Sequence, residues 1–229
     1  MTVLLAGRHE QDAVNPRGSA ILSLSVGFVA SVFAGSGFLL GLVREDLHFQ
    51  CSFHHMGSDD PGSFYCADGI GYIGVGVATY GVYGVILLIA LGIAMADLKS
   101  SGIQSRLMAG ISILPIAMFS WSTWYATSTR PIDQAPGANY WVQPLLPVTA
   151  VLVTAVIVIL AAGLIPRPRL RTAGFRVAMA LFIAAALIQP GSLSAVAVTL
   201  GTLAAAVCLE WRVPDEVETP TVTSAKKFL

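Results

Sequence analysis

The feature that most constrains this chain is a set of six long apolar runs, none of which carries an ionisable residue at its centre. About 20 apolar residues in a helix cross ~30 Å of hydrocarbon, and a helix satisfies its own backbone groups where water is absent. The sequence therefore predicts an all-α, polytopic integral membrane protein built as a six-transmembrane-helix bundle. The expected spans are residues 19–43, 69–96, 107–127, 145–165, 172–189 and 192–210.

Composition supports the membrane class. The chain is 55% hydrophobic and 11% charged, whereas soluble domains carry about 25% charged residues. The alternation over ~10 residues that marks a membrane-spanning strand is absent. The formal net charge is zero, so charge gives no argument for a nucleic-acid partner, and the expected surroundings are the lipid bilayer.

The remaining segments divide the chain simply. Residues 1–18 form a polar N-terminal segment, 19–211 the transmembrane domain, and 44–68 its largest outer loop. The first apolar run is too long for the core of a typical signal peptide, so we expect it to remain as a helix. Residues 212–229 are polar without apolar periodicity, and we expect a disordered tail.

The distribution of Lys and Arg predicts the orientation. With six spans, eleven of the 13 basic residues fall on the side of the two termini, and only Arg44 and Arg130 fall on the other. Basic residues accumulate on the cytoplasmic side of a membrane. We therefore expect a cell-membrane protein with both termini in the cytoplasm.

Two cysteines in the outer loop, Cys51 and Cys66, would face the oxidising side of the membrane. Such a pair favours a disulfide, and closing a loop of this length stabilises by about 3 kcal/mol in the chain-entropy model. The third cysteine, Cys208, lies near the end of the last span, where a small buried apolar role is the default.

The same loop offers an alternative chemistry, because His48, His54, His55 and Met56 are ligand types that suit copper or zinc. Their spacing matches no defined site, and adjacent histidines in an extended segment point to opposite sides. We expect a solvated loop with no metal and no cofactor, and the metal site stays open as the alternative.

Small residues in the first two spans predict where helices approach closely, because small side chains let membrane helices associate without a hydrophobic driving force. The sequence therefore predicts that these two spans form a tight pair. The packing residues expected are Gly27, Ser31, Gly35, Gly74, Gly76, Gly81 and Gly84.

Tyrosines at membrane depth in the second span need hydrogen-bond partners, and the hydroxyls of the third span are candidates. If a small molecule binds, we expect it in the outer half between these spans. Interhelical hydrogen bonds with an aromatic belt are the simpler interpretation. The candidate contacts are Tyr80, Tyr83, Ser120, Thr123 and Trp124.

A basic loop contains Arg167, Arg169 and Arg171. Basic residues beside a membrane attract anionic lipid headgroups by about 1 kcal/mol each. We expect these arginines to contact such headgroups as well as to set the topology.

What the spans lack narrows the function. No histidine lies within a span, which excludes a haem held between helices, and no mid-membrane charge offers a proton relay. The leading hypothesis is a non-enzymatic accessory or partner-binding bundle whose partners are other membrane subunits. The alternatives are a transporter or permease for a neutral or apolar solute, and a membrane enzyme or metal-handling protein that uses the 44–68 loop.

Overall fold

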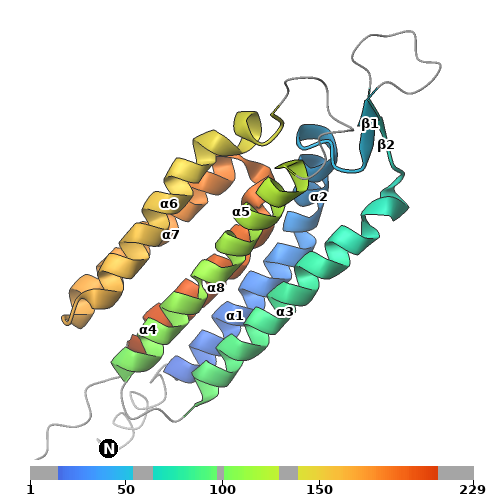
Figure 1. Cartoon of the computed structure of the whole chain (residues 1–229). Coiled ribbons are helices and arrows are strands. Elements are labelled where there is room, and N and C mark those ends of the chain that lie inside the picture. The colour runs from blue at the N-terminus through green and yellow to red at the C-terminus, as the bar shows by residue number, and fades with distance from the viewer. Residues whose placement is uncertain (1–14, 54–63, 97–100, 129–138, 211–229) are drawn as a thin grey trace, which may run out of the picture.

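The structure, a computed structural model, describes residues 15–53, 64–96, 101–128 and 139–210. Within these ranges, six helices are long and apolar enough to cross a membrane. The prediction of a helical bundle is confirmed at this level. The helices run side by side along one long axis (Figure 1).

Several spans are built from consecutive helical segments. The elements in chain order are α1 (Pro16–Phe33), α2 (Gly35–Gly41), the π-helical turn η1 (Leu42–Asp46), the 3-10 turn η2 (Gly69–Tyr72), α3 (Ile73–Met95), α4 (Ser101–Ile111), α5 (Ile113–Ser128), α6 (Val142–Leu164), α7 (Pro168–Ile188), the 3-10 turn η4 (Pro190–Ser192) and α8 (Leu193–Glu210).

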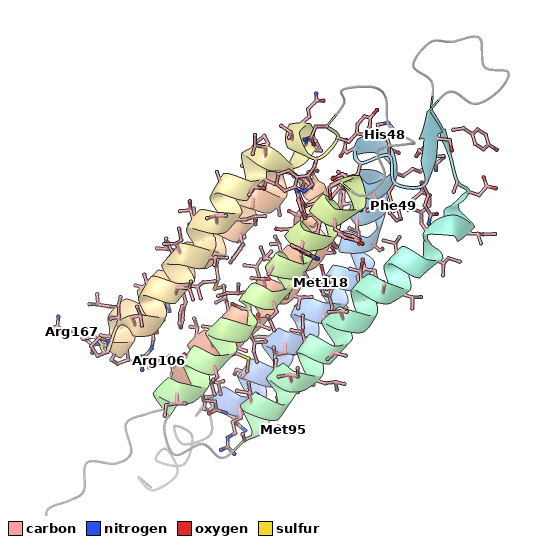
Figure 2. All side chains as sticks on the ribbon, in the orientation of Figure 1. His48, Phe49, Met95, Arg106, Met118 and Arg167 are labelled. Carbon is pink, nitrogen blue, oxygen red and sulfur yellow. A yellow bond between two sulfur atoms is a disulfide. The ribbon has the colours of Figure 1, made fainter. Side chains whose placement is uncertain are left out.

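The outer loop is not entirely irregular. Strands β1 (Cys51–Phe53) and β2 (Phe64–Cys66) pair antiparallel, with Cys51 opposite Cys66. This pair lies at one end of the bundle, the hairpin end, near His48 and Phe49. Arg106 and Arg167 lie at the opposite end, the basic end (Figure 2).

Local sequence explains where the helices begin and break. The Asn15 side chain accepts hydrogen bonds from the backbone N–H groups of Arg17 and Gly18, at 3.1 and 3.4 Å, and so caps α1. Proline fits the first turn of a helix, where α7 has Pro168. Pro115 lacks the N–H that would bond one turn back, which explains the break between α4 and α5 at Ser112.

Helix α8 is the centre of the bundle. It packs against α1, α4, α5 and α7, and most of its residues are buried. Its sequence is rich in Ala, Ser, Thr and Gly, so neighbours can approach it from several sides. A second pair, α6 and α7, packs at Gly174, where an added Cβ would lie 2.6 Å from the Ala162 Cβ.

The predicted tight pairing of the first two spans is wrong, because the small residues of α1 face α8. A Cβ on Gly27 would lie 2.8 Å from both the Ala197 carbonyl oxygen and the Gly201 Cα. A Cβ on Gly35 would lie 2.6 Å from the Ser194 Cα. Ser31 is buried between these two glycines on the same helix.

The four glycines predicted to pack in the second span are not close to any other part of the described chain. A Cβ added at Gly74, Gly76, Gly81 or Gly84 would find no heavy atom of the described residues within 4 Å. Helix α1 contacts α8 more extensively than it contacts α3. The glycines of α3 leave a bare surface on the side of the bundle.

Two predicted boundaries also shift at the basic end. Helix α4 begins at Ser101 rather than at residue 107, and α7 at Pro168 rather than at residue 172. The added turns contain polar residues that are buried by specific bonds. Ser105, for example, donates from its hydroxyl to the Ala206 carbonyl of α8 at 2.9 Å.

Candidate functional site

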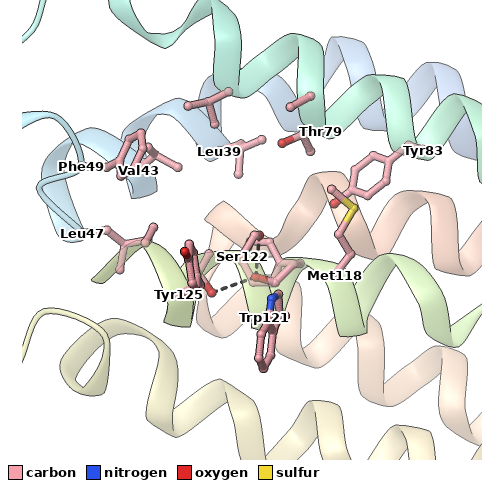
Figure 3. Close-up of a pocket in the computed structure, with 15 residues that line it drawn as sticks. Leu39, Val43, Leu47, Phe49, Thr79, Tyr83, Met118, Trp121, Ser122 and Tyr125 are labelled. Carbon is pink, nitrogen blue, oxygen red and sulfur yellow. Dashed lines mark hydrogen bonds between the residues drawn. The ribbon is translucent and has the colours of Figure 1, made fainter. Parts of the chain in front are cut away.

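The main candidate site is an apolar pocket of about 440 Å³ in the hairpin-end half of the bundle, between α2, α3 and α5 (Figure 3). Small-molecule sites typically occupy ~300–1,000 Å³. The pocket is lined by Leu39, Val43, Leu47, Phe49, Val75, Ala78, Thr79, Tyr83, Met118, Phe119, Trp121, Ser122, Thr123, Tyr125 and Ala126.

The pocket forms because α3 is held against α4 at the basic end, whereas it packs less closely against α5 at the hairpin end. Gln104 of α4 is buried, and its amide donates to the carbonyls of Ala94 and Ala96 near the end of α3, at 3.2 and 3.3 Å. Helix α3 contacts α4 more extensively than it contacts α5. The space left between α3 and α5 is lined from the third side by α2 and η1.

The segment after η1 closes the hairpin end of the pocket. His48 and Gln50 adopt positive φ angles of 49° and 60°, so the backbone turns sharply on both sides of Phe49. The Phe49 carbonyl accepts a hydrogen bond from the Tyr72 hydroxyl at 2.8 Å. Leu47 and Phe49 thus become apolar lining residues although they belong to a loop.

The predicted disulfide agrees with the structure. The sulfur atoms of Cys51 and Cys66 lie 1.99 Å apart. The bond joins β1 to β2, directly after the turn that carries Phe49. It therefore ties the closing segment of the pocket to the start of the α3 span.

One lining residue carries an unsatisfied polar group. Tyr83 is fully buried, and its hydroxyl has no hydrogen-bond partner among the described residues. The Ser194 hydroxyl is a polar neighbour of the Tyr83 hydroxyl, and the buried Ser194 and Ser31 hydroxyls are likewise unpartnered within the described chain. A buried polar group left unpaired costs about 1–3 kcal/mol.

Two other hydroxyls of the lining are better satisfied. Thr123 donates to the Phe119 carbonyl at 2.8 Å and accepts from the Trp141 indole N–H at 3.2 Å. Ser122 donates to the same carbonyl at 3.1 Å. The lining therefore combines apolar carbon with a few hydroxyls, of which the Tyr83 hydroxyl is buried and unpartnered among the described residues, and it includes no carboxylate, imidazole or amine.

The residues predicted to contact a small molecule divide into two groups. Tyr83 and Thr123 line the pocket. Tyr80 lies on another face of α3, where its hydroxyl donates to the Ser31 carbonyl at 3.4 Å and its ring lines a neighbouring cavity of about 220 Å³. Ser120 and Trp124 are not among the lining residues, and Trp124 is exposed.

Sequence reasoning missed the wall formed by Leu39, Val43, Leu47 and Phe49. The only available signal was the presence of apolar residues immediately after the charged residues that close the first span. Hydrophobic periodicity cannot show that such residues fold back against a neighbouring helix.

The alternative interpretation of the outer loop, a metal site, is not supported by the described residues. Among the described residues, no three His, Cys, Asp or Glu side chains gather closely enough to hold a metal ion. His48 instead lies beside Tyr140, with ring centroids 4.7 Å apart. His54, His55 and Met56 lie outside the described residues.

The basic loop also differs from the prediction, because one of its three arginines is buried. Arg171 is buried, and its guanidinium forms a bidentate ion pair with Glu210 of α8 while donating to the Ile165 carbonyl at 3.1 Å. The expectation that Arg171 contacts lipid headgroups is therefore wrong, because its donors are used inside the protein. Arg167 and Arg169 remain exposed.

Comparisons with known proteins give no relative for this chain: no family model, no curated protein and no solved structure matches it. The function must therefore be argued from the geometry of the site.

Proposed function

We propose that this chain is a non-enzymatic membrane protein that binds a neutral, apolar small molecule with a hydrogen-bonding group, taken from the outer half of the cell membrane. The observation that carries the proposal is the buried, unpartnered Tyr83 hydroxyl in the wall of an otherwise apolar pocket. A ligand carbonyl or hydroxyl beside Tyr83 would remove the cost of that group, while apolar carbon fills the remaining volume.

The orientation belongs to the same proposal. The distribution of basic residues supports a six-span topology with both termini in the cytoplasm, which puts the hairpin end outside. A reporter that is active only in the cytoplasm, fused after Leu229, should then be active. An inactive reporter on a folded fusion protein would contradict this orientation.

A route from the bilayer is consistent with the exposure of the lining. Trp121 and Tyr125 are exposed large side chains on α5, and Ala78 is exposed on α3. These residues border the pocket on the side of the bundle, where lipid would lie. A lipid-like molecule could enter there without crossing an aqueous phase.

Binding is better supported than conduction through the bundle. Beyond Tyr83, the side chains of Ile86, Ala90 and Ala94 on α3 are buried in the core. These buried side chains fill the space beside α3 in the basic-end half of the bundle. The transporter hypothesis would need this packing to open, whereas binding requires only the pocket already present.

A saturation assay with a tritiated long-chain alcohol on the purified, detergent-solubilised protein tests the proposal. Ala78→Phe places a large ring in the pocket and should weaken binding at least about tenfold, since a filled site loses the ligand's apolar contacts. Ala117→Phe is the matched control, because Ala117 is an exposed alanine on α5 that does not line the pocket. Equal saturable binding by both variants, or none by the unmodified protein, would refute the proposal.

A second candidate function, the partner-binding bundle, is favoured by the bare glycine surface of α3. Gly74, Ala78 and Gly81 are exposed along one side of that helix, and the two glycines have no described neighbour within 4 Å. The chain uses glycine for a close helix contact of its own, between Gly27 and Gly201. We propose that this surface receives a small-residue transmembrane helix of a different membrane subunit.

Gly81→Leu should block that contact and leave the fold intact, because Gly81 is exposed and a Cβ added there has no described heavy atom within 4 Å. Gly110→Leu on α4 is the matched control, since Gly110 is also exposed with no neighbour within 4 Å. A subunit that co-purifies stoichiometrically should be lost from the first variant alone. Its loss from both or neither, or cross-linking of α3 to a second copy of this chain, would contradict the assignment.

A further inference from the structure

A second cavity lies at the basic end, far along the bundle from the apolar pocket. It measures about 630 Å³ and is lined by Pro168, Arg169, Thr172, Ala173, Arg176 and Glu210. Five of these residues belong to the first three turns of α7, and the sixth is near the end of α8. Nothing in the proposed function uses this cavity.

The two arginines of the cavity share one face of α7 with a threonine. Residues 169, 172 and 176 are spaced three and four apart, which places them along the same side of a helix. Arg169 and Arg176 are separated by about 10 Å of helix rise, within reach of a common group through long side chains. Both are exposed, and neither forms an ion pair with another described residue.

The threonine adds a hydroxyl group to the cavity. Thr172 is 7% exposed, yet it lines the cavity. No other described residue forms a hydrogen bond with its hydroxyl. Threonines elsewhere in the bundle, such as Thr149 and Thr154, donate back to the carbonyl four residues earlier. Thr172 therefore belongs to a largely buried part of α7 and has a hydroxyl that is available to the cavity.

The start of α7 adds to the positive potential of the cavity. Helix α7 begins at Pro168, and no side chain caps its first turn. Unpaired backbone N–H groups and the helix dipole at such an end favour an anion.

Glu210 does not cancel this potential. Both of its carboxylate oxygens are engaged by the Arg171 guanidinium, so the charge of Glu210 is matched by a residue that does not line the cavity. Within the described part of the chain, Arg169 and Arg176 are left as the uncompensated charges of the cavity.

We propose that this cavity binds the phosphate of an anionic phospholipid, with Arg169 and Arg176 donating to its oxygens from two sides and Thr172 donating between them. The surroundings favour a lipid over free phosphate. Arg176 lies about 12 Å into α7 along the helix axis, at a depth that its long side chain can bridge to the headgroups. Exposed Leu170 and Val177 lie beside the arginines, where acyl chains would run.

Native mass spectrometry of the full-length protein, titrated with phosphatidylglycerol or phosphatidylcholine, tests the site. We expect preferential binding of phosphatidylglycerol, weakened about fivefold by Arg169→Gln or Arg176→Gln and about 25-fold by both changes together, from ~1 kcal/mol for each basic residue. Thr172→Val should weaken binding a few-fold, and Thr172→Ser should retain it.

Arg167→Gln is the matched control, because Arg167 is exposed in the same loop but does not line the cavity. It should bind phosphatidylglycerol within about twofold of the unmodified protein, as expected for charges that only add to the general field. The proposal is overturned if the double variant binds as tightly as the unmodified protein or if Arg167→Gln weakens binding equally. Displacement of the lipid by millimolar inorganic phosphate would identify a free-phosphate site and also overturn the lipid assignment.

Discussion

At the scale of single residues, the Tyr83 hydroxyl is the group that links the bundle's energetics to its proposed ligand. It is fully buried and unpartnered among the described residues, so in the empty protein it costs free energy. A ligand polar group beside the Tyr83 hydroxyl would offset this cost, and the pocket that Tyr83 lines has room for such a ligand.

Tyr83→Phe should therefore separate stability from binding. Removing an unsatisfied hydroxyl should leave the thermal stability of the empty protein unchanged or raise it by up to about 1 kcal/mol, while alcohol binding weakens about threefold to tenfold. Thermal unfolding in detergent and the saturation assay measure the two quantities. A variant that unfolds more easily and binds normally would show that the hydroxyl has a structural role instead.

Gly27 and Gly81 form a matched pair that tests whether the small residues of α1 pack against α8 rather than against α3. Gly27→Ala adds a methyl group 2.8 Å from backbone atoms of α8, and overpacking of this kind costs about 1–3 kcal/mol. Gly81→Ala adds the same group in open space and should change stability by less than about 0.5 kcal/mol. The unfolding temperatures of the two variants check this. Equal losses would mean that the close contact of α1 with α8 is not real.

The partner of Gly27 could not have been predicted from its own span. A small-residue ladder indicates that a helix will be approached closely, but it says nothing about which helix approaches. The other half of the information lay in α8, where Gly201 and Ser194 provide the matching surface. Helix α3 contains more glycines than α8, but the number of glycines in a helix does not show that its surface fits the surface of α1.

Arg171 and Glu210 lead to a prediction about the basic end. Arg171→Met leaves a buried carboxylate unpaired, which typically costs about 3–5 kcal/mol, whereas Arg171→Met with Glu210→Leu should recover much of that loss. Arg167→Met is the exposed control and should be near neutral. Thermal unfolding of the three variants gives the comparison. A single Arg171→Met variant as stable as the control would contradict the buried ion pair.

At the scale of elements, the disulfide between β1 and β2 stabilises the closing segment of the pocket. Under denaturing conditions without reductant, maleimide should add once, to Cys208, and after reduction three times. Replacing Cys51 and Cys66 by serine should destabilise by about 3 kcal/mol and weaken alcohol binding, because Phe49 is no longer held. Intact-protein mass spectrometry counts the adducts, and three additions without reductant would disprove the bond.

The elements themselves were largely predictable, because an apolar run without charge has few alternatives to a membrane helix. The residues at which the helices begin and end were harder to predict. Gln104 and Ser105 look like loop residues in sequence, yet both are buried in α4 by hydrogen bonds to backbone carbonyls of other helices. Such bonds depend on tertiary neighbours, which hydropathy does not contain.

At the scale of the whole molecule, the bundle is held together most closely through α8 and at the basic end, and it is open between α3 and α5 toward the hairpin end. Sequence reasoning located the small-molecule region in the outer half between the second and third spans, on the strength of polar groups such as Tyr83 and Thr123. It could not supply the third wall, because Leu47 and Phe49 reach the pocket only through the turn after η1.

Photolabelling tests the central claim, that this pocket binds an apolar molecule beside Tyr83. The full-length protein in lipid nanodiscs would be irradiated with a long-chain alcohol carrying a diazirine beside its hydroxyl, and the adducts mapped by peptide mass spectrometry. We expect saturable labelling of Tyr83 and Met118 that excess unlabelled alcohol prevents and Ala78→Phe abolishes. Labelling confined to exposed residues such as Leu88 and Leu160, insensitive to competitor, would contradict it.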